Sequence, residues 1–160
     1  MKKLLMLLAV VFMATGTTFA QDEHIDWVKL EQAQKQAKKD GKFTIIDMYT
    51  PWCGPCRMME NSTFSDPTFI AFVEENFHAV KFNAEGPNPV IYNGTEYKNL
   101  GYDPAKGNGR NSMHSLTRSI GIQGYPTIVV LDGTGAVVKK IVGFKKAADL
   151  QQQLTDIIKK

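Results

Sequence analysis

The sequence predicts an α/β domain in which a mixed central sheet is flanked by helices on both faces. Apolar, strand-like runs at 42–48, 79–82 and 127–131 are separated by segments in which apolar residues recur at helical spacing. Strands that alternate with helices favour parallel neighbours. The last run instead continues through turn residues at 132–135 into a return strand at 136–142, which predicts one antiparallel hairpin.

Length and composition indicate one globular domain. The chain has 160 residues, of which 43% are hydrophobic, and its formal net charge is +3. Charges of both signs are interspersed, and no basic block with interleaved aromatic residues occurs. The composition therefore does not indicate nucleic acid as a partner.

Residues 1–20 have the pattern of a secretory signal peptide. Two lysines precede an apolar stretch at 4–13, and small residues lead to an expected cleavage site before Gln21. The apolar stretch is short for a bilayer-spanning helix, although an uncleaved anchor is the alternative. We expect the mature domain to comprise residues 21–160 and to work in the periplasm, where disulfides persist.

Two helices are expected around the first predicted strand. The first would begin after Asp26, whose carboxylate can cap a helix, and would end at Gly41, with Trp27 on its apolar face. The second follows the strand, and we expect Met58 and Met59 to fill the core there rather than to contact substrate.

Three further helices complete the pattern. Asp66 and Pro67 predict a helix start, because Asp can cap a helix and Pro fits its first turn. A later helix is expected to be capped by Asn111 or Ser112, and the last one spans about 146–158.

Both cysteines of the chain lie in the segment Trp52-Cys53-Gly54-Pro55-Cys56, after the strand at 42–48. A Cys-x-x-Cys pair between a strand and a helix is typical of a redox site. Free backbone N–H groups and the helix dipole favour a thiolate there. A structural disulfide this short would constrain the unfolded chain little. A zinc site needs about four ligands, and the three histidines lie far apart in sequence.

The Trp-Cys-Gly-Pro-Cys motif resembles the active-site motif of thioredoxins, and the order of elements resembles the thioredoxin fold outside residues 84–111. Gly124-Tyr125-Pro126-Thr127 is similar to the thioredoxin segment whose proline is cis and faces the dithiol. The resemblance implies that Pro126 is cis, and that Trp52, Gly54 and Pro55 bind substrate opposite Gly124, Tyr125 and Pro126. A trans proline that begins an edge strand is the alternative.

Asp47 lies six residues before Cys53, where thioredoxins carry a buried acid, and Lys81 matches the lysine beside that acid. A carboxyl group inside an apolar strand is costly unless it is paired or protonated. Burial would raise its pKa toward the range that suits proton transfer. The resemblance implies that Asp47 takes the proton of Cys56, and an Asp47–Lys81 ion pair is the alternative.

Three segments resemble the periplasmic C-terminal domain of DsbD, an envelope reductant carrier: 47–49, Glu60 and 63–67. In that family an acid at the position of Glu60 lies near the dithiol and helps to set its protonation. A solvated helix position is the alternative for Glu60. The Gly-Pro dipeptide, the insertion at 84–111 and the lack of a transmembrane region depart from that family, so we expect a soluble, stand-alone member.

These features predict a periplasmic thiol:disulfide oxidoreductase that reduces protein disulfides through a mixed disulfide. Cys53 would be the nucleophile and Cys56 the resolving thiol, with no cofactor and no metal. We expect a monomer that acts on disulfide-bonded proteins and receives electrons from a membrane donor similar to DsbD. An oxidase or isomerase, an envelope copper(I) metallochaperone and a non-catalytic binding module are the alternatives.

Residues 84–111 are rich in Gly, Pro and Asn. Asn93-Gly94 between strand-like runs at 90–92 and 95–97 predicts a β-hairpin. Long loops without their own core are usually functional or disordered. We therefore expect this insertion to be a partner-specificity element beside the active site and not a folding element. A surface flap over a sheet edge or a helix is the alternative.

Overall fold

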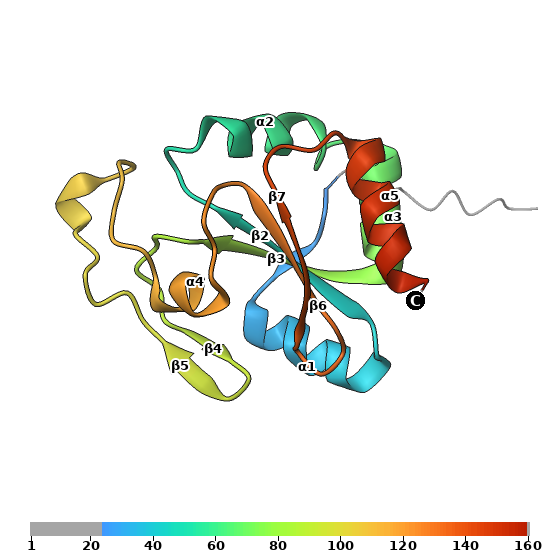
Figure 1. The fold of residues 1–160 in the computed structure, drawn as a ribbon, viewed down its shortest axis with the longest axis horizontal. Coiled ribbons are helices and arrows are strands. Elements are labelled where there is room, and N and C mark those ends of the chain that lie inside the picture. The colour runs from blue at the N-terminus through green and yellow to red at the C-terminus, as the bar shows by residue number, and fades with distance from the viewer. Residues whose placement is uncertain (1–23, 160) are drawn as a thin grey trace, which may run out of the picture.

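The computed structural model describes residues 24–159, which fold around a five-stranded mixed sheet (Figure 1). The strand order is β1-β3-β2-β6-β7: β1, β3 and β2 are parallel, whereas β6 and β7 are antiparallel to their neighbours. The strands are β1 Trp27–Val28, β2 Phe43–Tyr49, β3 Phe77–Asn83, β6 Thr127–Leu131 and β7 Val137–Val142. The helices are α1 Leu30–Asp40, α2 Gly54–Ser62, α3 Pro67–Asn76, α4 Ser115–Ile120 and α5 Ala147–Ile158.

This architecture confirms the predicted fold class. The signal peptide at residues 1–20 and the cleavage site before Gln21 lie outside the described residues. Within the described part of the chain, no helix combines the length and the apolar character needed to cross a membrane.

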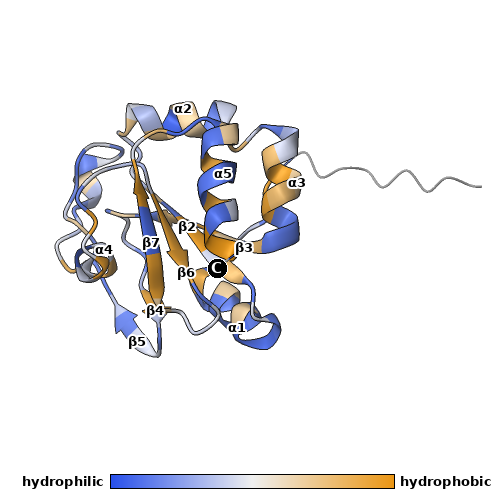
Figure 2. Ribbon diagram, turned by 45° about the vertical axis from the view of Figure 1, so that its right-hand side comes forward, coloured by the Kyte–Doolittle hydropathy of each residue, from blue (hydrophilic) through white to orange (hydrophobic). Residues whose placement is uncertain are grey.

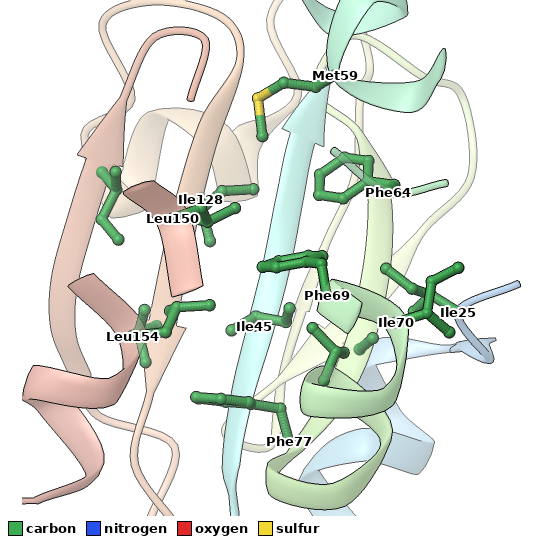
Figure 3. Close-up of a cluster of buried hydrophobic side chains, with 14 residues drawn as sticks. Ile25, Ile45, Met59, Phe64, Phe69, Ile70, Phe77, Ile128, Leu150 and Leu154 are labelled. Atoms are coloured by element: carbon green, nitrogen blue, oxygen red, sulfur yellow. The ribbon is translucent and has the colours of Figure 1, made fainter. Parts of the chain in front are cut away.

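Alternating side chains of the central strands divide the core into two clusters. On one face Ile45 and Ile128 pack with residues of α2, α3 and α5, including Met59, Phe69 and Leu150 (Figure 3). On the other face the next residues along the same strands pack against α1 and α4. Figure 2 shows hydrophobic central strands and hydrophilic residues on the outer faces of the helices. Because helices cover both faces of the sheet, a functional site is expected at the ends of the strands.

The start of α1 differs from the prediction. Helix α1 begins at Leu30, because Trp27 and Val28 pair with β3 as a short parallel strand. Asp26 is therefore not a helix cap, and its backbone N–H donates to Glu74 Oε1 at 2.7 Å. Gly41 ends the helix in the left-handed conformation (φ 78°), as predicted.

The start of α4 and the place of Met58 are also corrected. Helix α4 begins at Ser115 and is capped by His114, whose Nδ1 accepts from the N–H of Leu116 at 3.1 Å, so neither Asn111 nor Ser112 caps it. Burial lowers the pKa of His114, which keeps the ring neutral and able to accept. Met58 is 57% exposed, so the prediction of a core role holds only for Met59.

The cap of α3 matches the sequence. The side chain of Asp66 accepts from the N–H of Phe69 at 2.9 Å, and Pro67 occupies the first helical turn. Both features follow from the local residue types, and the prediction for this helix start is confirmed.

The insertion contains the predicted hairpin, with strands β4 Val90–Tyr92 and β5 Thr95–Tyr97. Asn93 (φ 49°) and Gly94 (φ 79°) form its turn. The hairpin packs on α1, where Gln34 donates to the carbonyl of Ile91 at 2.9 Å and accepts from the N–H of Asn93 at 2.8 Å. Val90 is buried in the second core cluster. The hairpin is thus part of the fold, and the expectation that the insertion has no folding role is wrong for this half.

Candidate active site

The two cysteines lie at the amino end of α2, where they form a disulfide. Cys53 is the N-cap residue, and its Sγ accepts from the N–H of Cys56 at 3.1 Å. Pro55 fits this first turn because proline has no backbone N–H, and the N–H groups of a first helical turn have no partner within the helix. Cys53 is 3% exposed and Cys56 is 7% exposed, so exposure does not distinguish the two sulfurs in the oxidised protein. The positions of the two cysteines do distinguish them, because Cys53 precedes helix α2 and Cys56 lies within it.

Asp47 lies on the Cys56 side of the disulfide, where it lines a cavity of about 120 Å³. Its side chain is 3% exposed, and its Oδ1 has no hydrogen-bond partner. Burial raises the pKa of Asp47 to about 7, an effect that Lys81 opposes and Glu60 strengthens. The cavity is lined by Asp47, Tyr49, Thr50, Pro51, Cys56, Arg57, Glu60 and Lys81. It therefore places a carboxyl group that titrates near neutral pH beside the second cysteine.

Lys81 is paired with Glu60, and no direct Asp47–Lys81 ion pair forms. Asp47 and Lys81 face each other in register on the parallel strands β2 and β3. The ammonium group instead contacts Glu60 and lies 5.3 Å from the centroid of the Tyr49 ring. Glu60 is thus an ion-pair partner at the wall of the cavity, not only a solvated helix residue. The positive charge of Lys81, which lowers the pKa of Asp47, is shared with the carboxylate of Glu60, and this sharing helps to explain why the pKa of Asp47 stays high.

Trp52 lies on the Cys53 side and is held from three directions. Its Nε1 donates to Glu85 Oε2 at 2.8 Å. Its ring meets that of Tyr125 edge to face, with the centroids 5.8 Å apart. Arg110 Cζ lies 4.4 Å from the centroid of the Trp52 ring. The Tyr125–Pro126 peptide bond is cis, which is the geometry that the resemblance implies.

The insertion supplies two of these contacts, through Glu85 at its start and Arg110 near its end. Glu85 Oε2 also accepts from the backbone N–H of Asn111 at 2.8 Å. Asn99 Nδ2 lies 2.7 Å from the carbonyl oxygen of Ser112 and 3.2 Å from those of Glu85 and Gly86. Asn99 thereby ties the two ends of the segment 99–111 together. Figure 1 shows this segment projecting beyond the sheet, on the side where α2 begins.

Sequence reasoning missed Glu85 and Arg110. Glu85 follows Lys81 by four residues and lies two residues beyond the end of β3, and that position beside the site was its only signal. Arg110 had no signal, because it belongs to the segment that the thioredoxin resemblance does not cover. Within residues 24–159, no group of three or more His, Cys, Asp or Glu side chains is arranged to hold a metal ion.

Comparisons with known proteins agree with this geometry. The sequence model of the thioredoxin-like domain family matches residues 30–158. The chain belongs to this family. Thioredoxin from Alicyclobacillus acidocaldarius is 28% identical over 127 residues, which are 78% of this chain and 90% of that protein.

Two thiol:disulfide interchange proteins are also similar. HelX of Rhodobacter capsulatus is 26% identical over 110 residues, which are 66% of this chain and 54% of HelX. DsbD of Escherichia coli K12 is 27% identical over 144 residues, which are 89% of this chain and 21% of DsbD. The chain thus spans about half of HelX and about a fifth of DsbD.

Solved structures show the same fold. The DsbH oxidoreductase superposes with a TM-score of 0.62 at 18% identity, with 85% of each chain covered. The oxidised C-terminal domain of Neisseria meningitidis DsbD gives a TM-score of 0.53 at 22% identity, with 79% of this chain and 91% of that chain covered. The family match, the interchange relatives and the Cys53–Cys56 pair identify a thiol:disulfide oxidoreductase.

Proposed function

We propose that the protein reduces disulfides of periplasmic proteins. The observation that carries the proposal is the unpaired carboxyl group of Asp47, which shares a cavity with Cys56 and has a pKa of about 7. A resolving thiol needs a base that is poised near the working pH. Asp47 has both the position and the pKa for that role.

The first step is the attack of the Cys53 thiolate on one sulfur of a substrate disulfide. The substrate S–S bond breaks, a Cys53–substrate disulfide forms, and the other substrate sulfur leaves as a thiolate that takes up a proton. Cys53 suits this step because it lies at the amino end of α2, where the helix dipole stabilises a negative sulfur.

The second step releases the reduced substrate. Asp47 takes the proton of Cys56, and the Cys56 thiolate attacks the sulfur of Cys53. The mixed disulfide breaks, the Cys53–Cys56 disulfide forms, and the second substrate sulfur leaves as a thiolate that is then protonated. Two electrons and two protons have moved to the substrate. The cavity is large enough for water, which can link Asp47 to the thiol.

The rim of the site would bind the substrate chain. Trp52 and Tyr125 present aromatic surface beside Cys53, and the exposed Pro55 borders the same end of α2. Strand β6 begins at Thr127, so the residues 124–126 precede the sheet and can pair with an extended substrate segment.

Location and direction rest on the sequence. The predicted signal peptide and the resemblance to the periplasmic DsbD domain support an envelope location. The Gly54-Pro55 dipeptide resembles that of reducing thioredoxins, which supports reduction over oxidation or isomerisation. Disulfide-bonded proteins would be the substrates, a monomer the working form, and a membrane reductant donor would restore the dithiol.

Catalysed reduction of insulin by dithiothreitol tests the proposal. We expect the wild-type protein to accelerate insulin reduction and Cys53→Ser to lose the acceleration completely. Cys56→Ser should form a mixed disulfide that persists and can be detected by mass spectrometry. Equal acceleration by wild type and Cys53→Ser would overturn the proposal.

A further inference from the structure

Arg110 is an exposed cation at the rim of the site, and the mechanism above does not use it. Its guanidinium carbon lies over the ring of Trp52, the residue directly before Cys53. Within the described residues it forms no ion pair. Two other cations, Lys81 and Arg57, line the cavity on the Cys56 side, where Lys81 is paired with Glu60 and Arg57 donates to the carbonyl of Pro51. On the Cys53 side, Arg110 thus presents a guanidinium that has no ion-pair partner within residues 24–159.

The backbone next to Arg110 is anchored. The neighbouring Asn111 donates its backbone N–H to Glu85, and its side chain exchanges hydrogen bonds with the backbone of Asp103. The carboxylate of Glu85 is 8% exposed and already accepts from Asn111 and Trp52. Both hydrogen bonds go to Oε2, and no ion pair joins this carboxylate to the guanidinium of Arg110. The contact with the face of Trp52 then restricts the position of the Arg110 side chain.

We propose that Arg110 is a specificity-determining residue that binds an acidic side chain close to the disulfide of the substrate protein. A guanidinium stacked on an aromatic ring keeps its edge donors free, and these match a carboxylate in bidentate geometry. Because stacking orders the side chain in advance, little further conformational entropy is lost on binding. This inference rests on the proposed reductase function and names the class of substrate that it prefers.

The alternative role for Arg110 is mechanical. It would only hold the Trp52 ring in place, and the charge of the substrate would then not matter. The two roles differ in one observable, which is the dependence of the rate on substrate charge. A long-range electrostatic effect differs again, because any cation on the same loop would produce it.

Two synthetic peptides test the proposal, each closed by one disulfide and differing only in Glu or Gln beside a cysteine. The measured quantity is the rate constant for oxidation of the pre-reduced protein by each peptide. We expect the wild type to react on the order of threefold to fivefold faster with the Glu peptide, the range of an exposed ion pair. Added salt should reduce this preference.

Arg110→Gln should abolish the preference, so that the variant reacts with the Glu peptide no faster than with the Gln peptide. Lys106→Gln is the matched control, because it removes the same charge from the same exposed loop and should keep the preference. Arg110→Lys should retain part of it, since the charge remains but the planar fork is lost.

Three results would overturn the inference. Equal slowing of both peptides by Arg110→Gln would show that Arg110 only holds Trp52. Equal rates of the wild type with the two peptides would show that the site does not recognise the charge of the substrate. If Lys106→Gln lost the preference for the Glu peptide as fully as Arg110→Gln, the preference would come from the long-range electrostatic field of the loop. If the wild type reduced neither peptide, the proposed function itself would be wrong, and that outcome is distinct from the other three.

Discussion

The two sides of the Cys53–Cys56 disulfide are built in different ways. On the Cys56 side, Asp47 and Lys81 lie in register on two neighbouring strands and line a small cavity. On the Cys53 side, Trp52 is held by Glu85, 33 residues along the chain, and by Arg110 from the insertion. The first arrangement handles a proton, and the second faces the substrate. We infer that chemistry and recognition can be altered separately in this protein.

The largest expected effect concerns stability, and it belongs to the buried side. The pKa of Asp47 rises from its ordinary value near 3.8 to about 7 in the folded protein, mainly because of burial. Between those values the unfolded chain releases the proton while the folded chain keeps it, so the free energy of unfolding falls as pH rises. Above about pH 7 the folded protein has also released the proton, and the free energy of unfolding has then fallen by about 2 to 4 kcal/mol for a pKa shift of this size.

Asp47→Asn removes this titration. The variant should be about 2 to 4 kcal/mol more stable than the wild type at pH 8, and nearly equal to it at pH 4. Urea unfolding of the oxidised proteins at the two pH values measures the difference. A stability difference that does not change with pH would mean that Asp47 does not titrate in this range, and the buried side would lose its proton acceptor.

The next effect is on the rate of resolution. Asn is close to Asp in shape but cannot accept a proton at working pH, so Asp47→Asn should slow the attack of Cys56 by about tenfold to a hundredfold. Formation of the mixed disulfide should change much less, because Cys53 lies on the other side. Acid-quenched single-turnover reactions, with the mixed disulfide quantified by mass, separate the two steps.

Glu60→Gln is the matched control for that experiment. It removes one negative charge from the wall of the same cavity and releases Lys81, which lowers the pKa of Asp47 and weakens it as a base. We expect a smaller slowing of the same step, by about twofold to threefold. Slowing of the first step alone in Asp47→Asn would contradict the division between the two sides, and no effect in Glu60→Gln would remove Glu60 from the site.

The sequence predicted the buried side because local pattern and chemistry coincide there. A strand followed by Cys-x-x-Cys specifies the helix start, and a single acid inside that apolar strand has to be buried. The Asn93-Gly94 hairpin was predicted for the same reason, since its turn depends on two residues. Its docking on α1 depends on a long-range contact with Gln34, which no local pattern reveals.

The rim could not be predicted from local patterns. Arg110 reaches Trp52 only after the insertion has folded back on itself through Asn99 and Asn111. Asp26 failed as a cap for a related reason, since pairing of Trp27–Val28 with β3 overrode the local signal for a helix start. Long-range contacts decided each of these positions.

The reduction potential of the Cys53–Cys56 pair tests the central claim most directly, because it sets the direction of electron flow. Equilibration with dithiothreitol or glutathione buffers, followed by alkylation and mass analysis, gives the fraction reduced at each potential. The account predicts a value near that of thioredoxins, about −270 mV, at which the dithiol gives electrons to substrate disulfides. A value near about −120 mV, typical of a strong oxidant, would contradict it.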